Sequence, residues 1–87
     1  MSAAFPGQDR AKHMGELKRG EERWEVFVEM QADAEVGAVR GRVHFVNGER
    51  RRTTSWIFLE PSEREIQKRF GEFSAVELWH FVAALDG

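Results

Sequence analysis

Three histidines are the side chains of this sequence best suited to acid–base or metal chemistry: His13, His44 and His80. They lie far apart in the chain, and no H-x-x-x-H or H-x-x-E spacing arises that would predict a metal site. His44 is expected to face Glu25 from the solvated side of a strand, and His80 to lie on the polar edge of a helix. Each is therefore interpreted first as a solvated side chain and only second as a general base.

Covalent catalysis has little support in the residue types present. The 87 residues include no Cys, and no Tyr, so thiolate nucleophiles, disulfides and thiolate metal ligands are excluded. Ser62 and Ser74 fall at helix-capping positions and lack the G-x-S-x-G setting of a nucleophilic serine. No glycine-rich phosphate loop is recognisable. We expect no enzyme activity, no cofactor and no metal site.

Five arginines in the middle of the chain are the candidates for binding nucleic acid: Arg40, Arg42, Arg50, Arg51 and Arg52. A basic β-ribbon can enter a groove or follow the phosphate backbone. Base stacking would also require aromatic side chains on the same face, and Phe27 is the clearest candidate. Pairing with nearby carboxylates is the favoured interpretation, because a basic run alone is a weak motif.

The arginines fall on a predicted β-hairpin that turns at Asn47-Gly48. Two β-prone runs flank this dipeptide, and both of its residues tolerate the positive φ that a two-residue hairpin turn requires. Such a turn directs Trp56 and Phe58 towards the core. A loop of three or five residues would direct Ile57 and Leu59 inward instead. The two-residue turn is preferred.

A strand over residues 24–32 is predicted before this hairpin, since apolar and polar residues alternate there with period two. The next strand, over about residues 38–46, has its apolar residues at odd positions. Matching the two apolar faces fixes the predicted register on the outer face. That register pairs Glu29 with Arg40, Phe27 with Arg42, and Glu25 with His44.

Two helices are predicted after the sheet. Residues 62–65 and 74–77 both read Ser-x-x-Glu, the capping box that begins a helix. Gly71 is expected to end the first helix as a left-handed C-cap. The second helix, over about residues 75–85, carries an apolar arc wider than contact with one sheet face requires. Trp79 and Phe81 lie on that arc.

The predicted fold is α+β, with an antiparallel three-stranded meander followed by two C-terminal helices packed on one face (β-β-β-α-α). Residues 24–87 form this single domain, and residues 1–23, rich in glycine and charge, are predicted to be a flexible tail. His13-Met14 also fits a cloning remnant joined to a natural start at Met14. The predicted core comprises Trp24, Val26, Val28, Val39, Val43, Phe45, Trp56, Phe58, Ile66, Phe70, Leu78, Val82 and Leu85.

Charge and hydropathy indicate which binding partners and which cellular location to expect. The net charge of −2 gives no bulk attraction to nucleic acid or to a membrane. No stretch approaches the ~20 apolar residues of a membrane span, and no apolar segment typical of a signal peptide follows Met1. The expected location is the cytoplasm, without a membrane partner.

Protein association is the leading functional hypothesis. The apolar arc of the second helix is wider than its contact with the sheet, and the third strand has apolar side chains on both of its faces. Apolar surface is therefore expected to remain exposed, and such surface usually marks a contact site. A homodimer would supply core that so short a chain lacks, although another protein could also be the partner. The expected interface residues are Phe27, Ile57, Leu59, Trp79 and Phe81. The alternatives are a nucleic-acid-binding domain that uses residues 40–52, and an accessory subunit of an enzyme whose site another chain completes.

Overall fold

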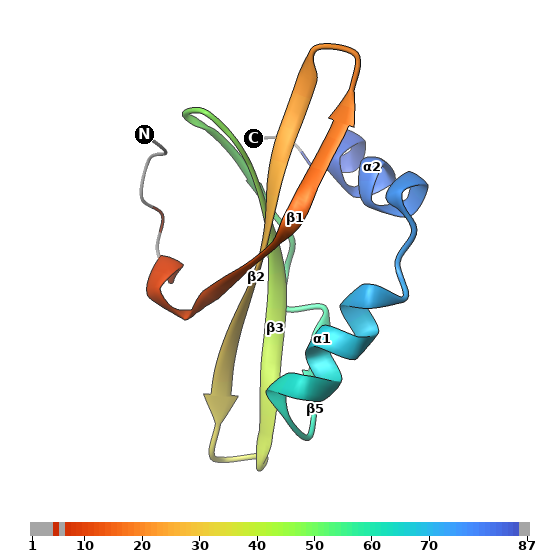
Figure 1. Ribbon diagram of the computed structural model, residues 1–87. Helices are drawn as coiled ribbons and strands as arrows, with labels where there is room; N and C mark the ends of the chain where they lie inside the picture. Colours follow the sequence, from red (N-terminus) through yellow and green to blue (C-terminus); the bar gives the residue numbers. More distant parts are fainter. Residues whose placement is uncertain (1–4, 6, 86–87) are drawn as a thin grey trace.

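The computed structural model describes Phe5 and residues 7–85. These residues form a short 3-10 helix, five strands and two α-helices. Figure 1 shows the strands as one twisted sheet with both α-helices on the same side. The predicted α+β class, an antiparallel sheet followed by two C-terminal helices, is confirmed. The elements are η1 (Gln8–Arg10), β1 (Ala11–Arg19), β2 (Glu22–Asp33), β3 (Ala38–Asn47), β4 (Arg50–Thr53), β5 (Phe58–Glu60), α1 (Glu63–Gly71) and α2 (Ala75–Ala84).

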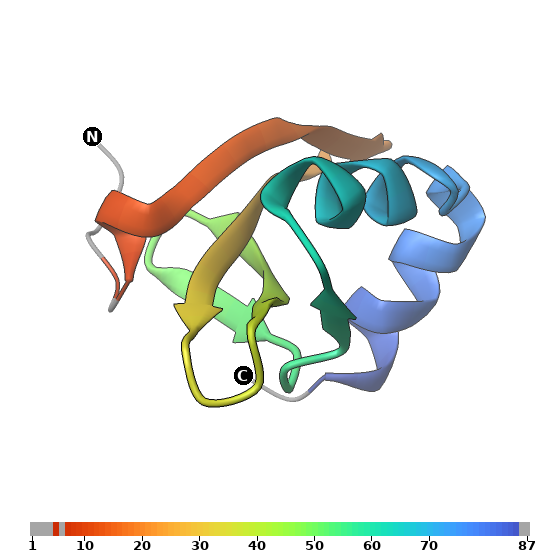
Figure 2. The same ribbon diagram turned by 90° about the horizontal axis from the view of Figure 1, so that it is seen from below.

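The sheet has the order β1-β2-β3-β4, and β5 pairs with β3 beyond the end of β4. Strand β3 is therefore central, with β2 on one side and β4 and β5 in succession on the other. All of these pairings are antiparallel. Figure 2 shows the sheet curving around α1, so that the helices fill its concave side.

Strand β1 occupies residues that the sequence predicts to be part of a flexible tail, and for these residues the prediction is wrong. β1 pairs with β2 along its whole length, from Ala11 opposite Glu29 to Arg19 opposite Glu22. An edge strand of this kind gains its backbone hydrogen bonds from one neighbour and needs few apolar residues. Leu17 supplies the buried contact. Residues 1–4 and 6 of the predicted tail lie outside the described residues.

The register of β2 on β3 differs from the predicted one by two residues. Glu29 lies opposite Arg42, and Phe27 lies opposite His44. The cause is the position of the connecting loop, residues 34–37, which is centred one residue later in the chain than the predicted register requires. Its first turn is closed by a hydrogen bond from the Glu35 N–H to Asp33 Oδ1 (3.1 Å), and Gly37 has a positive φ of 63°. Because the shift is even, every side chain keeps its predicted face.

The turn between β3 and β4 is also displaced from its predicted position. Asn47 pairs with Arg50, so the two central residues are Gly48 and Glu49. Gly48 has φ 61°, as the first central position of a type II′ turn demands. β4 is consequently shifted by two residues against β3, and Arg52 lies opposite Phe45 on the core side.

The predicted core position of Trp56 is wrong, whereas that of Phe58 is confirmed. β4 ends with Thr53 opposite His44, and β5 begins with Phe58 opposite Gly41, so residues 54–57 face only two residues of β3. This bulge returns Phe58 to the core side, where it is buried. Trp56 instead lies beneath the Arg42 guanidinium, whose Cζ is 4.3 Å from the ring centroid.

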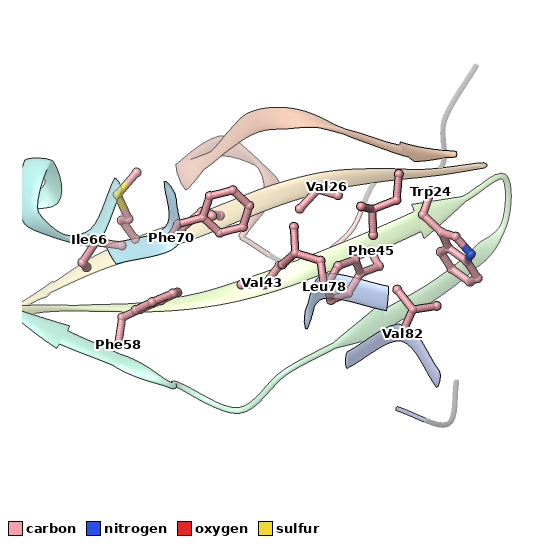
Figure 3. Packing of buried hydrophobic residues seen from close by; sticks show 12 residues of the cluster. Trp24, Val26, Val43, Phe45, Phe58, Ile66, Phe70, Leu78 and Val82 are labelled. Carbon is pink, nitrogen blue, oxygen red and sulfur yellow. The ribbon is translucent and has the colours of Figure 1, made fainter. Parts of the chain in front are cut away.

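The core lies between the helices and the face of the sheet that carries the even residues of β2 and the odd residues of β3 (Figure 3). Val39 and Leu85, predicted to be buried, are partly buried against this core. Leu17 and Met30 belong to it as well. The confirmed core residues are Trp24, Val26, Val28, Val43, Phe45, Phe58, Ile66, Phe70, Leu78 and Val82.

Both helices begin at the predicted serines. Ser62 accepts a hydrogen bond from the Glu65 N–H (3.3 Å), and the Ser74–Glu77 capping box is complete, with bonds of 3.2 and 2.9 Å. The left-handed cap predicted at Gly71 is wrong, because α1 ends in right-handed backbone at Glu72. Two backbone hydrogen bonds form the turn between α1 and α2. The Glu72 N–H donates to the Arg69 carbonyl and the Phe73 N–H to the Phe70 carbonyl. No residue of this turn has a positive φ.

The contact of α1 with the sheet depends on a small residue in β3. A Cβ built on Gly41 would lie 3.1 Å from Ile66 Cγ2 and 3.4 Å from Phe58 Cβ, so the helix packs almost directly on the backbone. Ile66 is fully buried at this point. Its side chain therefore fixes the position of α1 over the sheet.

Replacing Ile66 by Ala is expected to lower the free energy of unfolding by about 2–5 kcal/mol, because it leaves a cavity under α1. Urea unfolding followed by tryptophan fluorescence measures the change. The control is Val76→Ala on α2, where the side chain is 64% exposed, and a change within about 0.5 kcal/mol is expected. Equal losses in the two variants would contradict the proposed packing of α1.

Candidate functional site

The outer face of the sheet, defined as the face turned away from α1 and α2, carries the odd residues of β2 and the even residues of β3. Figure 1 shows η1 on this side, opposite the helices. The outer face contains a buried group of hydrogen-bonded polar side chains. It also contains most of the arginines singled out from the sequence.

A chain of three hydrogen-bonded side chains crosses the outer face from β2 to β4. Glu29 Oε1 lies 2.7 Å from His44 Nε2, and His44 Nδ1 lies 2.9 Å from Thr53 Oγ1. Glu29 and His44 are each only 2% exposed. Arg42 Nε donates to the same Glu29 oxygen at 2.8 Å. The buried carboxylate is therefore paired with a cation and an imidazole, as burial of a charge requires.

The environments of Glu29 and His44 determine their protonation states. Burial by itself would raise the pKa of Glu29, but hydrogen bonds from Arg42 and His44 outweigh it and hold that pKa below its ordinary value. Burial lowers the pKa of His44, and the opposing effect of Glu29 does not restore it. A neutral His44 that donates from Nε2 to the ionised Glu29 must accept at Nδ1. The Thr53 hydroxyl is then the donor to His44.

Phe5 and Gly7 cover this polar chain. The Phe5 ring lies 4.4 Å from the His44 ring, centroid to centroid, and 5.5 Å from that of Phe27. Gly7 adopts φ 82°, and a Cβ built there would lie 2.2 Å from Glu29 Oε2. Only glycine fits this position. Phe5 and Gly7 both fall in the predicted tail, which explains why sequence inspection did not connect them with a site.

The predicted basic cluster is divided between the two faces of the sheet. On the core side, Arg50 and Arg52 each place Cζ 5.0 Å from the Trp24 ring centroid, and Arg52 Nη1 also donates to the Val82 carbonyl in α2. On the outer face, Arg40 is paired with Asp33 at 2.6 Å. Arg51 lies near Phe5, with its Cζ 5.8 Å from the ring centroid. Arg42 completes the outer group.

The predicted interface residues are covered to different degrees. Phe27 is half-buried between Phe5 and His13, whose rings lie 5.5 and 5.0 Å away. Trp79 is half-buried beneath the Arg19 guanidinium at 4.2 Å, and Phe81 packs edge-on against Phe73. Two residues next to or within β5 remain the most accessible of the set. These are Ile57, 38% exposed, and Leu59, 60% exposed.

The interpretation of His44 as a solvated residue facing Glu25 is wrong, and two of its partners were missed. His44 is buried, lies opposite Phe27 and bonds to Glu29. The predicted register pairs Glu29 with Arg40, and the sequence pattern assigns no role to Thr53. The position of the loop between β2 and β3 is the signal that would reveal this group. A four-residue loop at residues 34–37 places Glu29 opposite Arg42 and within reach of His44.

Comparison with known protein families, curated proteins and solved structures finds no match. In the part of the chain that the structure describes, neither helix has the length and apolar character needed to cross a membrane. Among the same residues, no three side chains of His, Asp or Glu are grouped so that they could hold a metal ion. Functional inference therefore has to start from the two features above, the covered polar chain and the accessible residues at β5.

Acidification below pH 7 is expected to destabilise the fold through His44. Its pKa in the folded protein is lowered from 6.5, so its stabilising effect is complete above 6.5 and is lost as the pH falls towards the lowered value. Glu29 adds a second loss, since the stability from its lowered pKa is present above 4.5 and disappears below it. Thermal unfolding measured between pH 7.5 and 3.5 should therefore show a falling Tm.

Two variants identify the source of this pH dependence. His44→Gln should flatten the profile between about pH 7 and 5, because no buried imidazole then takes up a proton. His80→Gln, at an exposed position on α2, should leave the slope unchanged. A wild-type Tm that is constant from pH 7.5 to 5 would contradict the assigned role of His44.

Proposed function

We propose that this protein is a non-catalytic interaction module of the cytoplasm that forms a homodimer through the edge of the sheet at β5. The observation that supports the proposal is the exposure of Ile57 (38%) and Leu59 (60%) beside or within an edge strand. Apolar side chains exposed together in this way usually mark a contact with another protein. The remaining predicted interface residues have partial cover within the chain and contribute less.

The backbone of β5 supports pairing with a second copy. Within the described sheet β5 pairs with β3 alone, and an edge strand presents unpaired N–H and C=O groups to any further strand. Two copies of β5 related by a two-fold axis would run antiparallel, so each would satisfy the other with the same surface. Leu59 projects from the outer face opposite Arg40. A two-fold axis near β5 would therefore bring the two Leu59 side chains together.

A hollow beside this edge supports the same partner. It has a volume of about 340 Å³, and its walls include Ile57, Phe58 and Phe73. Charges of both signs surround it, since Arg69 lies 3.6 Å from both Glu60 and Glu72. A second copy of the same surface can place its arginine against the glutamates of the first and its glutamates against the arginine. A partner with a strong charge of one sign would be repelled either by the arginine or by the glutamates.

Leu59→Asp is expected to convert the dimer to a monomer, because it places a charge in the apolar part of the interface. Size-exclusion chromatography with light scattering should give twice the chain mass for the wild type at tens of micromolar and the single mass for the variant. Val76→Asp is the matched control, since Val76 is 64% exposed but lies on α2, and it should remain dimeric. A monomeric wild type under these conditions would refute the proposal.

Nucleic-acid binding is the second candidate, supported by the exposed Arg51 on the outer face, whose guanidinium lies 5.8 Å from the ring of Phe5. Retention on heparin should then fall steeply with salt, because bound phosphates release counterions. Arg51→Ala should elute earlier than Arg64→Ala, which removes the same charge from an exposed position on α1. Equal elution of the two variants, or no retention at low salt, would eliminate this candidate.

A further inference from the structure

A small pocket opens at the end of the buried hydrogen-bonded chain. Its volume is about 150 Å³, and it is lined by Arg42, His44, Arg51 and Thr53. The pocket is therefore formed by two arginines, a hydroxyl and an imidazole from the neighbouring strands β3 and β4. Ligand pockets for drug-sized molecules span roughly 300–1,000 Å³. This one is large enough only for a small group.

The charges around the pocket are unequal. Glu29 is held by Arg42 at 2.8 Å and by His44 at 2.7 Å, so its negative charge is already compensated behind the pocket wall. Arg51 has no carboxylate within ion-pair distance among the residues that the structure describes. Its guanidinium lies over the Phe5 ring, which packs on His44. The pocket therefore has a net positive character and favours an anion.

The walls of the pocket are held in place before any ligand arrives. Arg42 is fixed by its bond to Glu29 and by stacking at 4.3 Å on Trp56. Thr53 is fixed by its bond to the buried His44. Polar groups oriented in this way lose little conformational entropy when they bind a ligand. Arg51 is the one exposed member, and it is free to close over an anion.

We propose that this pocket binds a phosphate group, either as the free ion or as the monoester of a small molecule. A phosphate carries a charge of about −1.5 to −2 at neutral pH and offers three strong acceptor oxygens, which suits guanidinium donors that approach from two strands. A planar carboxylate would be satisfied by one arginine in a bidentate pair. This assignment is independent of the proposed dimer, because it uses residues of β3 and β4 and none of β5.

Titration of the wild-type protein with inorganic phosphate at constant ionic strength tests the proposal, with NMR signals of the His44 ring and the Thr53 methyl group as the readout. Both signals are expected to shift and to saturate. Parallel titrations use glycerol 3-phosphate and acetate. Tighter binding of glycerol 3-phosphate than of inorganic phosphate would identify a monoester site, and the reverse order would identify a site for the free ion. Acetate that binds as tightly as phosphate would overturn the assignment.

Arg51→Gln should weaken phosphate binding by about tenfold, the order expected for the loss of one charge-assisted hydrogen bond. Arg64→Gln, which makes the same change at an exposed position on α1, should bind phosphate as the wild type does. Because Arg51 is exposed, its replacement should leave the fold intact, and unchanged NMR signals of the core would verify this. Equal affinities of the two variants, or wild-type shifts that do not saturate, would refute the site.

Discussion

The buried carboxylate of Glu29 is the constraint on which the outer half of this structure depends. A charge removed from water is costly unless cations and hydrogen bonds compensate it, and here Arg42 and His44 both reach the same oxygen from β3. These bonds require the observed register, in which Glu29 lies opposite Arg42. A shift of two residues would keep every side chain on its face but leave the carboxylate beside different partners. The alternation of apolar residues fits either register, because a shift of two residues does not change it. The hydrogen bonds of Glu29 therefore determine which register forms.

The same carboxylate explains why Phe5 and Gly7 belong to the folded structure. Gly7 packs against Glu29 so closely that no Cβ fits, and Phe5 covers the imidazole that bonds to the carboxylate. Removing water from the polar chain strengthens each of its hydrogen bonds. The apolar core on the opposite face needs no such cover, because α1 and α2 enclose it. The helices thus cover one face of the sheet, and Phe5 and Gly7 cover the other face at Glu29 and His44.

The apolar core was predictable from sequence because it depends on local patterns. Period-two alternation identified Trp24, Val26 and Val28, and serine capping boxes identified both helices, since neither signal requires knowledge of a distant partner. The polar site was not predictable in the same way. It depends on the position of one loop, on the displaced turn at Gly48 and on a bulge that carries Trp56 to the other face. The loop and the turn each move a pairing by two residues, which leaves the hydrophobic pattern unchanged and alters the polar contacts between the strands. The bulge also moves one predicted core residue, Trp56, to the outer face.

The arginines show why residue type alone was a poor guide to function here. Arg52 is used inside the fold, where it lies over Trp24 and holds the Val82 carbonyl of α2, and Arg42 neutralises Glu29. The sequence gives no sign that Arg42 and Arg52 differ from Arg51. Only Arg51 is both exposed and part of the pocket lining. Arg42 also joins the two proposed sites, because it forms a wall of the pocket and stacks on Trp56 in the segment that leads into β5.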